Sequence, residues 1–533
     1  MVLNSKLKKL VTAGLAVGMA TTFLVGCGGG GSSSGGSAST LKVGVTNFAD
    51  TLEPTENFFA WVVMRYGVGE TLAKFDEKMR TQPWLAESWK ISDDHLTWTF
   101  KIRDNVKFSN GDPVTAEAVK DSIERAFAKQ NRAKTFFEYT SIEANGQELI
   151  IHTTKPVPNM PGQLADPLFL IVNVKTEKDG RNFAKEGPIG TGPYMVESFT
   201  RDKCVLKKNP NYWDGPVPYE RVEVPSIDDP NTRAMALQSG EIDMAVNIAA
   251  GDIGLFRSND KFHVDEIASL RTVLARINQK PDHILSDKRV REAFISACDR
   301  KNYNEVLLKG TFMPGKAPIP PSLDYDFDKL TDPNSYNVER AKKLLDEAGW
   351  KDTDGDGIRE KNGVKAEFVI NGRANDLQRY NTAVALAQDA KKLGINIIAK
   401  STPWSEARKI ARNIPTVWAF GDYTPQMFYN YYHSSQVGVN VIHNPAIYRN
   451  PTVDAHIDRA LAAVTDEEML KEFRAAQWDG VTGPKADVPY LWIATVQVPY
   501  FVNDQLDLGR LRVGERGQGM GILITLDQWQ WKK

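Results

Sequence analysis

Few residue patterns in this chain could carry out chemistry. Asp352, Asp354 and Asp356 alternate like the carboxylates of a calcium loop, but Gly363 stands where an EF-hand needs its bidentate Glu. We interpret that segment as a solvated turn. The single G-x-S-x-G match, at residues 31–35, lies in a Gly/Ser run that offers no strand or helix for a nucleophile elbow, and no HExxH occurs. We therefore expect no enzyme, no catalytic residue and no cofactor.

The N-terminal segment carries targeting signals instead. Three lysines precede an apolar run at 10–25, which is too short to span a membrane comfortably and is typical of a secretory signal. The run ends in Leu24–Cys27, which resembles a bacterial lipobox and implies cleavage before Cys27 and lipid on its sulfur. We expect a signal peptide at 1–26 and a Gly/Ser tether at 27–40 that reaches roughly 20 Å. The alternative is a signal peptide with an incidental cysteine.

Length and composition indicate a large globular body. Cleavage would leave 507 residues with a formal charge of −4, so two or more lobes are expected. Such a mild charge gives no reason to expect nucleic acid or an electrostatic membrane patch. Beyond Cys27 only Cys204 and Cys298 remain. They could form a disulfide in an exported protein or be two buried thiols, and the sequence leaves both open.

Past residue 40, strand-like and helix-like segments alternate, which predicts an α/β fold. Residues 96–102 alternate apolar and polar side chains, as a half-buried strand does. Thr115 is placed to cap a helix with an apolar stripe at every fourth residue. Asn337 is placed to cap a second helix, and Gly349 stands where a left-handed residue ends such helices.

The segment Leu85–Ser122 resembles the signature of the extracellular solute-binding proteins of the oligopeptide, dipeptide and nickel type, which serve ABC importers. Further blocks follow in that family's order, at Ile189–Tyr194, Asn209–Trp213, Thr232–Ala245, Asp287–Arg300 and Tyr336–Trp350. Together they extend over essentially the whole mature chain.

The resemblance implies an α/β, two-lobed fold like that of periplasmic binding proteins, of type II and the large oligopeptide-binding subclass. The larger lobe would comprise 41–277 plus 489–533, and the second lobe 278–488. The lobes would close on ligand about strand crossovers, which we expect near Ala275–Lys280 and Val488–Leu491.

In this family the ligand lies between the lobes, where aromatic and charged side chains contact it. The aromatic segment Trp418–His433 is the richest candidate. Asp422 matches the Asp that pairs with the α-ammonium group of the ligand in peptide-binding relatives, although the match needs a gap. A turn role for Asp422 is the alternative.

Nickel-type relatives place a Trp and a Tyr around a metal chelate in the same segment, where Phe420 and Tyr423 would match. They also have a first-lobe Arg for the chelator's carboxylate. The corresponding stretch here has no Arg, although Arg132 lies in a neighbouring block. His433 and His443 are candidate metal ligands under this alternative only, because neutral imidazole suits nickel.

Aromatic residues near the N-terminus complete the candidate set, since flat rings there could stack on a ligand. Burial inside the first lobe is the equal alternative for these rings. The candidate ligand-binding residues are Phe58, Trp61, Arg132, Trp418, Phe420, Asp422, Tyr423 and Phe428.

These observations predict a monomeric, lipid-anchored binding protein outside the cytoplasmic membrane. It would capture a short peptide or peptide-like ligand and deliver it to an ABC permease and its ATPase. The alternative is uptake of nickel or another metal chelate. A ligand-sensing receptor lipoprotein and a secreted hydrolase are remote alternatives.

Overall fold

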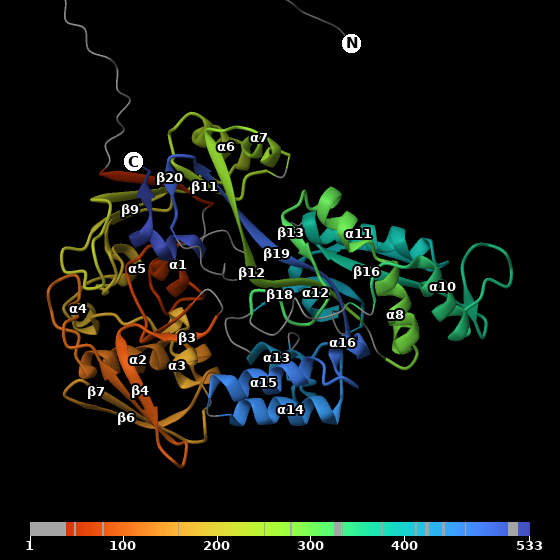
Figure 1. Ribbon diagram of the computed structural model, residues 1–533, viewed down its shortest axis with the longest axis horizontal. Coiled ribbons are helices and arrows are strands. Elements are labelled where there is room, and N and C mark those ends of the chain that lie inside the picture. Colours follow the sequence, from red (N-terminus) through yellow and green to blue (C-terminus); the bar gives the residue numbers. More distant parts are fainter. Residues whose placement is uncertain are drawn as a thin grey trace, which may run out of the picture. The chain divides into compact units, whose positions relative to one another are not determined.

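The computed structural model describes residues 39–532 apart from a set of short segments (Figure 1). The segments outside the description are 47–49, 77–78, 158, 250, 278–279, 324–331, 333, 375–376, 411–412, 422–425, 440–442, 464 and 510–520. Cys27 and the predicted signal peptide and tether lie outside it as well. No helix in the described part of the chain is long and apolar enough to cross a membrane.

The main structural unit is an 11-stranded mixed sheet with the order β17-β16-β18-β12-β19-β11-β1-β10-β9-β8, and β13 also pairs with β19. Parallel and antiparallel pairs both occur, as expected for an α/β protein. In chain order its strands are β1 (Thr40–Gly44), β8 (Tyr194–Phe199), β9 (Lys203–Lys208), β10 (Arg221–Pro225), β11 (Met244–Val246), β12 (Phe262–Arg276), β13 (Phe312–Pro314), β16 (Glu367–Arg373), β17 (Asn396–Thr402), β18 (Thr416–Phe420) and β19 (Tyr490–Asn503).

Two long strands, β12 and β19, connect the two ends of this sheet. Their first pairing block joins Phe262–Ala268 to Gln497–Asn503, beside β11, and their second block lies beside β18. Between the blocks the register shifts, so that residues 269–271 of β12 lie opposite Val496 alone. This β-bulge falls where the sheet passes from one half of the molecule to the other.

A separate four-stranded antiparallel sheet has the order β4-β5-β7-β6. As predicted, Trp98, Phe100 and Ile102 of one strand are all buried on one face. The predicted cap is also confirmed, because Thr115 Oγ1 accepts a hydrogen bond from Ala118 N at 3.2 Å at the start of α2 (Ala116–Lys129). The strands are β4 (Ala86–Ile91), β5 (Thr97–Ile102), β6 (Tyr139–Asn145) and β7 (Glu148–Thr153).

Helices pack around both sheets, and their ends follow local residue chemistry. Asn337 Oδ1 accepts from Arg340 N at 2.9 Å, and Gly349 adopts φ +83° just past the helix, which confirms both predicted ends of α10. The helices other than α2 are α1 (Ala60–Arg65), α3 (Met160–Gln163), α4 (Val174–Lys178), α5 (Phe183–Glu186), α6 (Pro230–Gln238), α7 (Ile253–Arg257), α8 (Lys288–Ala297), α9 (Arg300–Asn302), α10 (Val338–Glu347), α11 (Leu377–Lys391), α12 (Trp404–Ile410), α13 (Gln426–Tyr432), α14 (Pro451–Ala462), α15 (Asp466–Gln477) and α16 (Pro484–Asp487). Short two-stranded pairs are β2 (Ala73–Phe75) with β3 (Thr81–Pro83), β14 (Glu360–Lys361) with β15 (Val364–Lys365), and β20 (Leu506–Asp507) with β21 (Gln530–Trp531).

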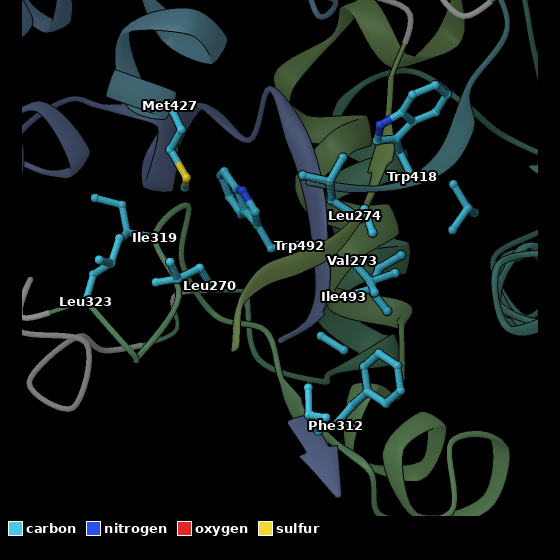
Figure 2. Close-up of a cluster of buried hydrophobic side chains, with 14 of the residues drawn as sticks. Leu270, Val273, Leu274, Phe312, Ile319, Leu323, Trp418, Met427, Trp492 and Ile493 are labelled. Carbon is cyan, nitrogen blue, oxygen red and sulfur yellow. The ribbon is translucent and has the colours of Figure 1, made fainter. Parts of the chain in front are cut away.

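The hydrophobic core is continuous along the connecting strands. Leu270, Leu274 and Trp492 belong to one buried cluster with residues from both ends of the large sheet (Figure 2). Cys204 and Cys298 are each buried and free. Of the two possibilities that the sequence left open, a disulfide or two buried thiols, the structure has the two thiols. Burial raises the pKa of both thiols to about 12, so they stay protonated at neutral pH.

Candidate functional site

A pocket of about 270 Å³ lies against the bulge that joins the two pairing blocks of β12 and β19. Arg271 of the bulge and Val496 opposite it both line the pocket. The bulge is held locally, because Ser269 Oγ donates to Val496 O at 2.8 Å and accepts from Arg271 N at 3.1 Å. A bulge re-aims the side chains that follow it, and here it brings Arg271 to the pocket.

The far wall of the pocket comes from the carboxyl ends of parallel strands. Arg373 is the last residue of β16, and Ala419 is the penultimate residue of β18. The first turns of α11 add Gln378, Arg379 and Thr382. Ligands of open α/β sheets bind outside the carboxyl ends of the strands, so the pocket lies at the edge where such a site is expected.

Two glycines allow this wall to form. A Cβ on Gly372 would collide with the Tyr380 backbone, so its absence lets α11 pack tightly onto the end of β16. A Cβ on Gly421 would collide with the carbonyl of Leu270, so its absence lets the end of β18 lie against the bulge. Both glycines are needed for close backbone approach rather than for an unusual φ.

The lining is divided into an apolar half and a basic half. Val273, Ala419 and Val496 share the apolar half with Leu308 and Phe312, which approach from the segment before β13 and from β13 itself. Arg271, Arg373 and Arg379 form the basic half, and each is half-buried. Each of the three arginines also has an interaction within the protein. No sequence motif points to these arginines; the only signal in the sequence is that basic residues flank the end of an apolar strand.

Two of the predicted residues, Phe58 and Arg132, contact each other but do not line this pocket. The Arg132 guanidinium lies 5.2 Å from the ring centre of Phe58 and 5.0 Å from that of Phe136. It also binds both oxygens of Asp166, at 2.7 and 3.3 Å. The Asp166 side chain is only 1% exposed, so the charge of Arg132 is largely compensated within the protein. We call Phe58, Arg132, Phe136 and Asp166 the Arg132 cluster.

Three predicted aromatic residues are buried. Trp61 packs with the guanidinium of Arg65 at 5.6 Å, and Trp418 packs against that of Arg276 at 3.7 Å. Phe428 stacks on Tyr432, with ring centres 4.5 Å apart.

Three further predicted residues are Phe420, Asp422 and Tyr423. Asp422 and Tyr423 lie outside the described residues, and of Phe420 only the backbone is described. Phe420 is the last residue of β18 and follows Ala419, which lines the pocket.

The two predicted histidines make local contacts. His433 Nδ1 accepts a hydrogen bond from Ser435 N at 3.1 Å and so caps the start of a 3₁₀ turn. The Nε2 atom of His433 lies 3.3 Å from a carboxylate oxygen of Asp458. His443 Nδ1 lies 2.7 Å from Gln436 Oε1, and burial lowers the pKa of His443.

Among the described residues, the one group of three metal-type ligands is Asp352, Asp354 and Asp356. All three are exposed, and Lys365 contacts Asp354 at 3.3 Å and Asp356 more closely. A hairpin of β14 and β15 follows in place of a second helix, in line with a solvated turn.

Glu70 is a buried acid that the sequence analysis did not single out. Its side chain lines a cavity of about 50 Å³ and accepts from Thr191 Oγ1 at 2.7 Å and Trp213 Nε1 at 2.8 Å, both at Oε2. Oε1 is buried without a hydrogen-bond partner. Burial raises the pKa of Glu70 to about 8, with a smaller contribution from the nearby Asp214 carboxylate.

Comparisons with known proteins all point to one protein family. Residues 80–439 match the model of the bacterial extracellular solute-binding proteins, family 5. The chain is 27% identical to the nickel-binding protein NikA of Staphylococcus aureus over 92% of its own length and 93% of that protein. It is 28% identical to the oligopeptide-binding protein AppA of Bacillus subtilis, over 86% of this chain and 85% of that one.

Solved structures agree on the fold. NikA from Brucella suis, in complex with Fe(III)-EDTA, superposes with a TM-score of 0.79 at 23% identity, covering 92% of this chain and 100% of that one. AppA from Bacillus subtilis, in complex with a nonapeptide, gives a TM-score of 0.68 at 24% identity, covering 93% and 99%. These similarities confirm the two-lobed α/β fold.

Proposed function

Since the chain belongs to the bacterial extracellular solute-binding proteins, family 5, we propose that it captures a small solute and delivers it to the permease of an ABC importer. Relatives of the chain bind either oligopeptides or nickel. A short peptide or peptide-like solute is the first candidate, and a metal chelate is the second. The family consists of binding proteins rather than enzymes, and we propose no catalytic step and no resident cofactor for this chain.

One observation supports capture by closure: the arginine-lined pocket lies at the bulge through which β12 and β19 pass from one half of the sheet to the other. A bulge interrupts the ladder of hydrogen bonds and is a natural place for two strands to bend. We place the hinge at residues 269–271 and Val496, on the pocket side of the crossovers predicted near Ala275–Lys280 and Val488–Leu491. A ligand that contacts both halves would stabilise the closed state by its differential affinity.

We propose partners of both signs for the ionic groups of the ligand. Carboxylates suit the three arginines, because charge-assisted hydrogen bonds to guanidinium groups can be bidentate. Asp422 remains our candidate for the α-ammonium group of a peptide. We expect that Asp422→Ala weakens binding of trialanine more than that of N-acetyl-trialanine; equal losses would contradict the assignment.

The N-terminal segment supports anchoring outside the cytoplasmic membrane. We propose that Cys27 carries lipid and that the tether leaves the binding lobes free, as a monomer, to meet the permease. A Cys27→Ser variant should appear in the fraction released from membranes. Its persistence in membranes after a high-salt wash would refute lipid anchoring.

Native mass spectrometry tests the proposed function. The full protein, isolated from cells grown in rich medium, is compared with the same sample after denaturation. Extra masses that fit short peptides support the peptide candidate, and an adduct with a nickel isotope pattern supports the chelate candidate. A protein that carries no small molecule and acquires none from peptide or nickel–histidine mixtures would contradict the proposal.

A further inference from the structure

We propose that Ser269 is a positioning residue for ligand binding, whose hydroxyl holds the bulge of β12 in the form that brings Arg271 to the pocket. The inference rests on the proposed function, because the pocket is where we place the solute. It goes beyond that function by naming a side chain that does not itself line the pocket and yet determines how the pocket binds a carboxylate.

The first argument is the pair of hydrogen bonds that the Ser269 hydroxyl makes. Ser269 is 0% exposed, and its Oγ donates to Val496 O on β19 at 2.8 Å and accepts from Arg271 N at 3.1 Å. A bulge interrupts the ladder between two strands, so backbone groups beside it lose their usual partners. The hydroxyl replaces those partners on both strands at once, and one of them is the backbone of the residue that reaches the pocket.

The second argument is that other segments of the chain hold the residues before Arg271. Ser322 Oγ donates to the carbonyl oxygen of Ser269 at 2.5 Å. Leu270 belongs with Ile319 to the buried cluster drawn in Figure 2. The direction of the Arg271 side chain therefore follows from the form of the bulge. Because Ser269 also ties β12 to β19, the two strands bend as a pair, and Arg271 keeps its place relative to both.

The third argument is the close fit of the pocket around the bulge. Arg271 and Val496, whose backbone groups bond to the Ser269 hydroxyl, both line the pocket. Gly421 packs directly on the bulge, since a Cβ there would meet the Leu270 carbonyl oxygen at 2.0 Å. Groups that bind a ligand must be held within about 0.5 Å of their productive geometry. Loss of the hydroxyl should therefore weaken the contact between Arg271 and a ligand carboxylate.

Isothermal titration calorimetry with trialanine and trialanine amide tests the inference, because the amide lacks the terminal carboxylate. We expect the unaltered protein to bind trialanine at least about tenfold more tightly, the ratio that one charge-assisted contact produces. Ser269→Ala should bring the two affinities within about threefold of each other, and Ser269→Thr, which keeps the hydroxyl, should retain the tenfold ratio. A Ser269→Ala variant that keeps the tenfold ratio overturns the inference.

Ser122 provides a matched control for a purely structural role. Its hydroxyl is also buried, donating to Leu170 O at 2.9 Å and accepting from Val172 N at 3.0 Å, but it belongs to α2 and does not line the pocket. Ser122→Ala should lower the stability to unfolding as Ser269→Ala does and leave the affinity ratio at about tenfold. A fall in the ratio like that of Ser269→Ala would show that lost stability alone lowers it, and would overturn the inference.

A second variant keeps the test decisive if Ser269→Ala does not fold. Ser322→Ala removes the hydrogen bond to Ser269 O from a half-buried residue and should lower the ratio at least about threefold; an unchanged ratio overturns the inference. Equal affinity of the unaltered protein for the two peptides overturns the inference and leaves the proposed function intact. If the unaltered protein binds neither peptide, the inference fails, and native mass spectrometry decides whether the proposed function fails with it.

Discussion

Arginine serves two different purposes in the Arg132 cluster and in the arginine-lined pocket. In the cluster, one guanidinium is held by both oxygens of Asp166 and lies against two aromatic rings. In the pocket, three guanidinium groups line one space whose described walls include no acid. The protein supplies the counter-charge of Arg132 through Asp166 in the first region. In the second region, we propose that the guanidinium groups bind a carboxylate of the ligand.

The comparison also shows why Arg132 was an attractive prediction. Sequence alone places an arginine near aromatic residues and cannot show that Asp166, 34 positions away, forms its ion pair. The variants below test whether arginines of the first kind contribute to stability rather than to binding.

The largest effect is expected at Arg125, the most fully paired arginine near the Arg132 cluster. It binds Glu53 at 2.7 Å and Glu177 at 2.6 Å, and its side chain is 6% exposed. Arg125→Gln leaves Glu53 without its paired cation and Glu177 with Lys129 alone, and should lower the free energy of unfolding by about 3–5 kcal/mol. Urea unfolding measures this loss. Lys129→Gln is the matched control, because Lys129 also contacts Glu177 but is exposed; it should cost under about 1 kcal/mol. Equal losses would contradict this role.

A smaller loss is expected at Arg132 itself. Arg132→Gln leaves the buried Asp166 carboxylate with weaker partners, which should cost about 2–3 kcal/mol of unfolding free energy. Binding of trialanine should change by less than about threefold. Lys134→Gln, an exposed change in the same turn, is the control. A variant that is fully stable but binds poorly would show that Arg132 contributes to ligand binding rather than to stability.

The next effect concerns Glu70. Unlike the paired arginines, Glu70 is a buried charged-type residue that forms no ion pair. Its pKa of about 8 lies above the ordinary carboxyl value of 4.5, so the folded state keeps a proton that the unfolded state releases. Stability should therefore fall as pH rises from about 4.5 to about 8, by up to about 1.4 kcal/mol per pH unit, and should level off above. Glu70→Gln should remove this slope in unfolding curves, and Glu87→Gln, an exposed change, should keep it. Parallel curves for Glu70→Gln and the unaltered protein would contradict the assignment.

The smallest effect is that of salt. Raising sodium chloride from low to high concentration should weaken trialanine binding several-fold, because the pocket is only half-buried and its charges are partly screened. Trialanine amide should be less affected, because it lacks the carboxylate. Equal salt dependence of the two peptides would count against carboxylate binding by the arginines.

The features that the sequence predicted correctly depend on near neighbours. Thr115 and Asn337 cap their helices within three residues, and the strand at 97–102 follows its own alternation. The pocket depends on distant segments and on strand register instead. Leu274 pairs with Trp418, whereas Val273 pairs with Ala419, and only the second pair lines the pocket. Successive residues of a strand face opposite sides, so the small Ala419 lines the pocket and the conspicuous Trp418 is buried beneath Arg276.

The most direct test of the account is a crystal structure of the protein with trialanine. We predict a ligand carboxylate within hydrogen-bond distance, about 2.7–3.2 Å, of at least one of Arg271, Arg373 and Arg379, with Arg132 still paired to Asp166. A ligand bound through Arg132, with the arginine-lined pocket left without a carboxylate, would contradict it.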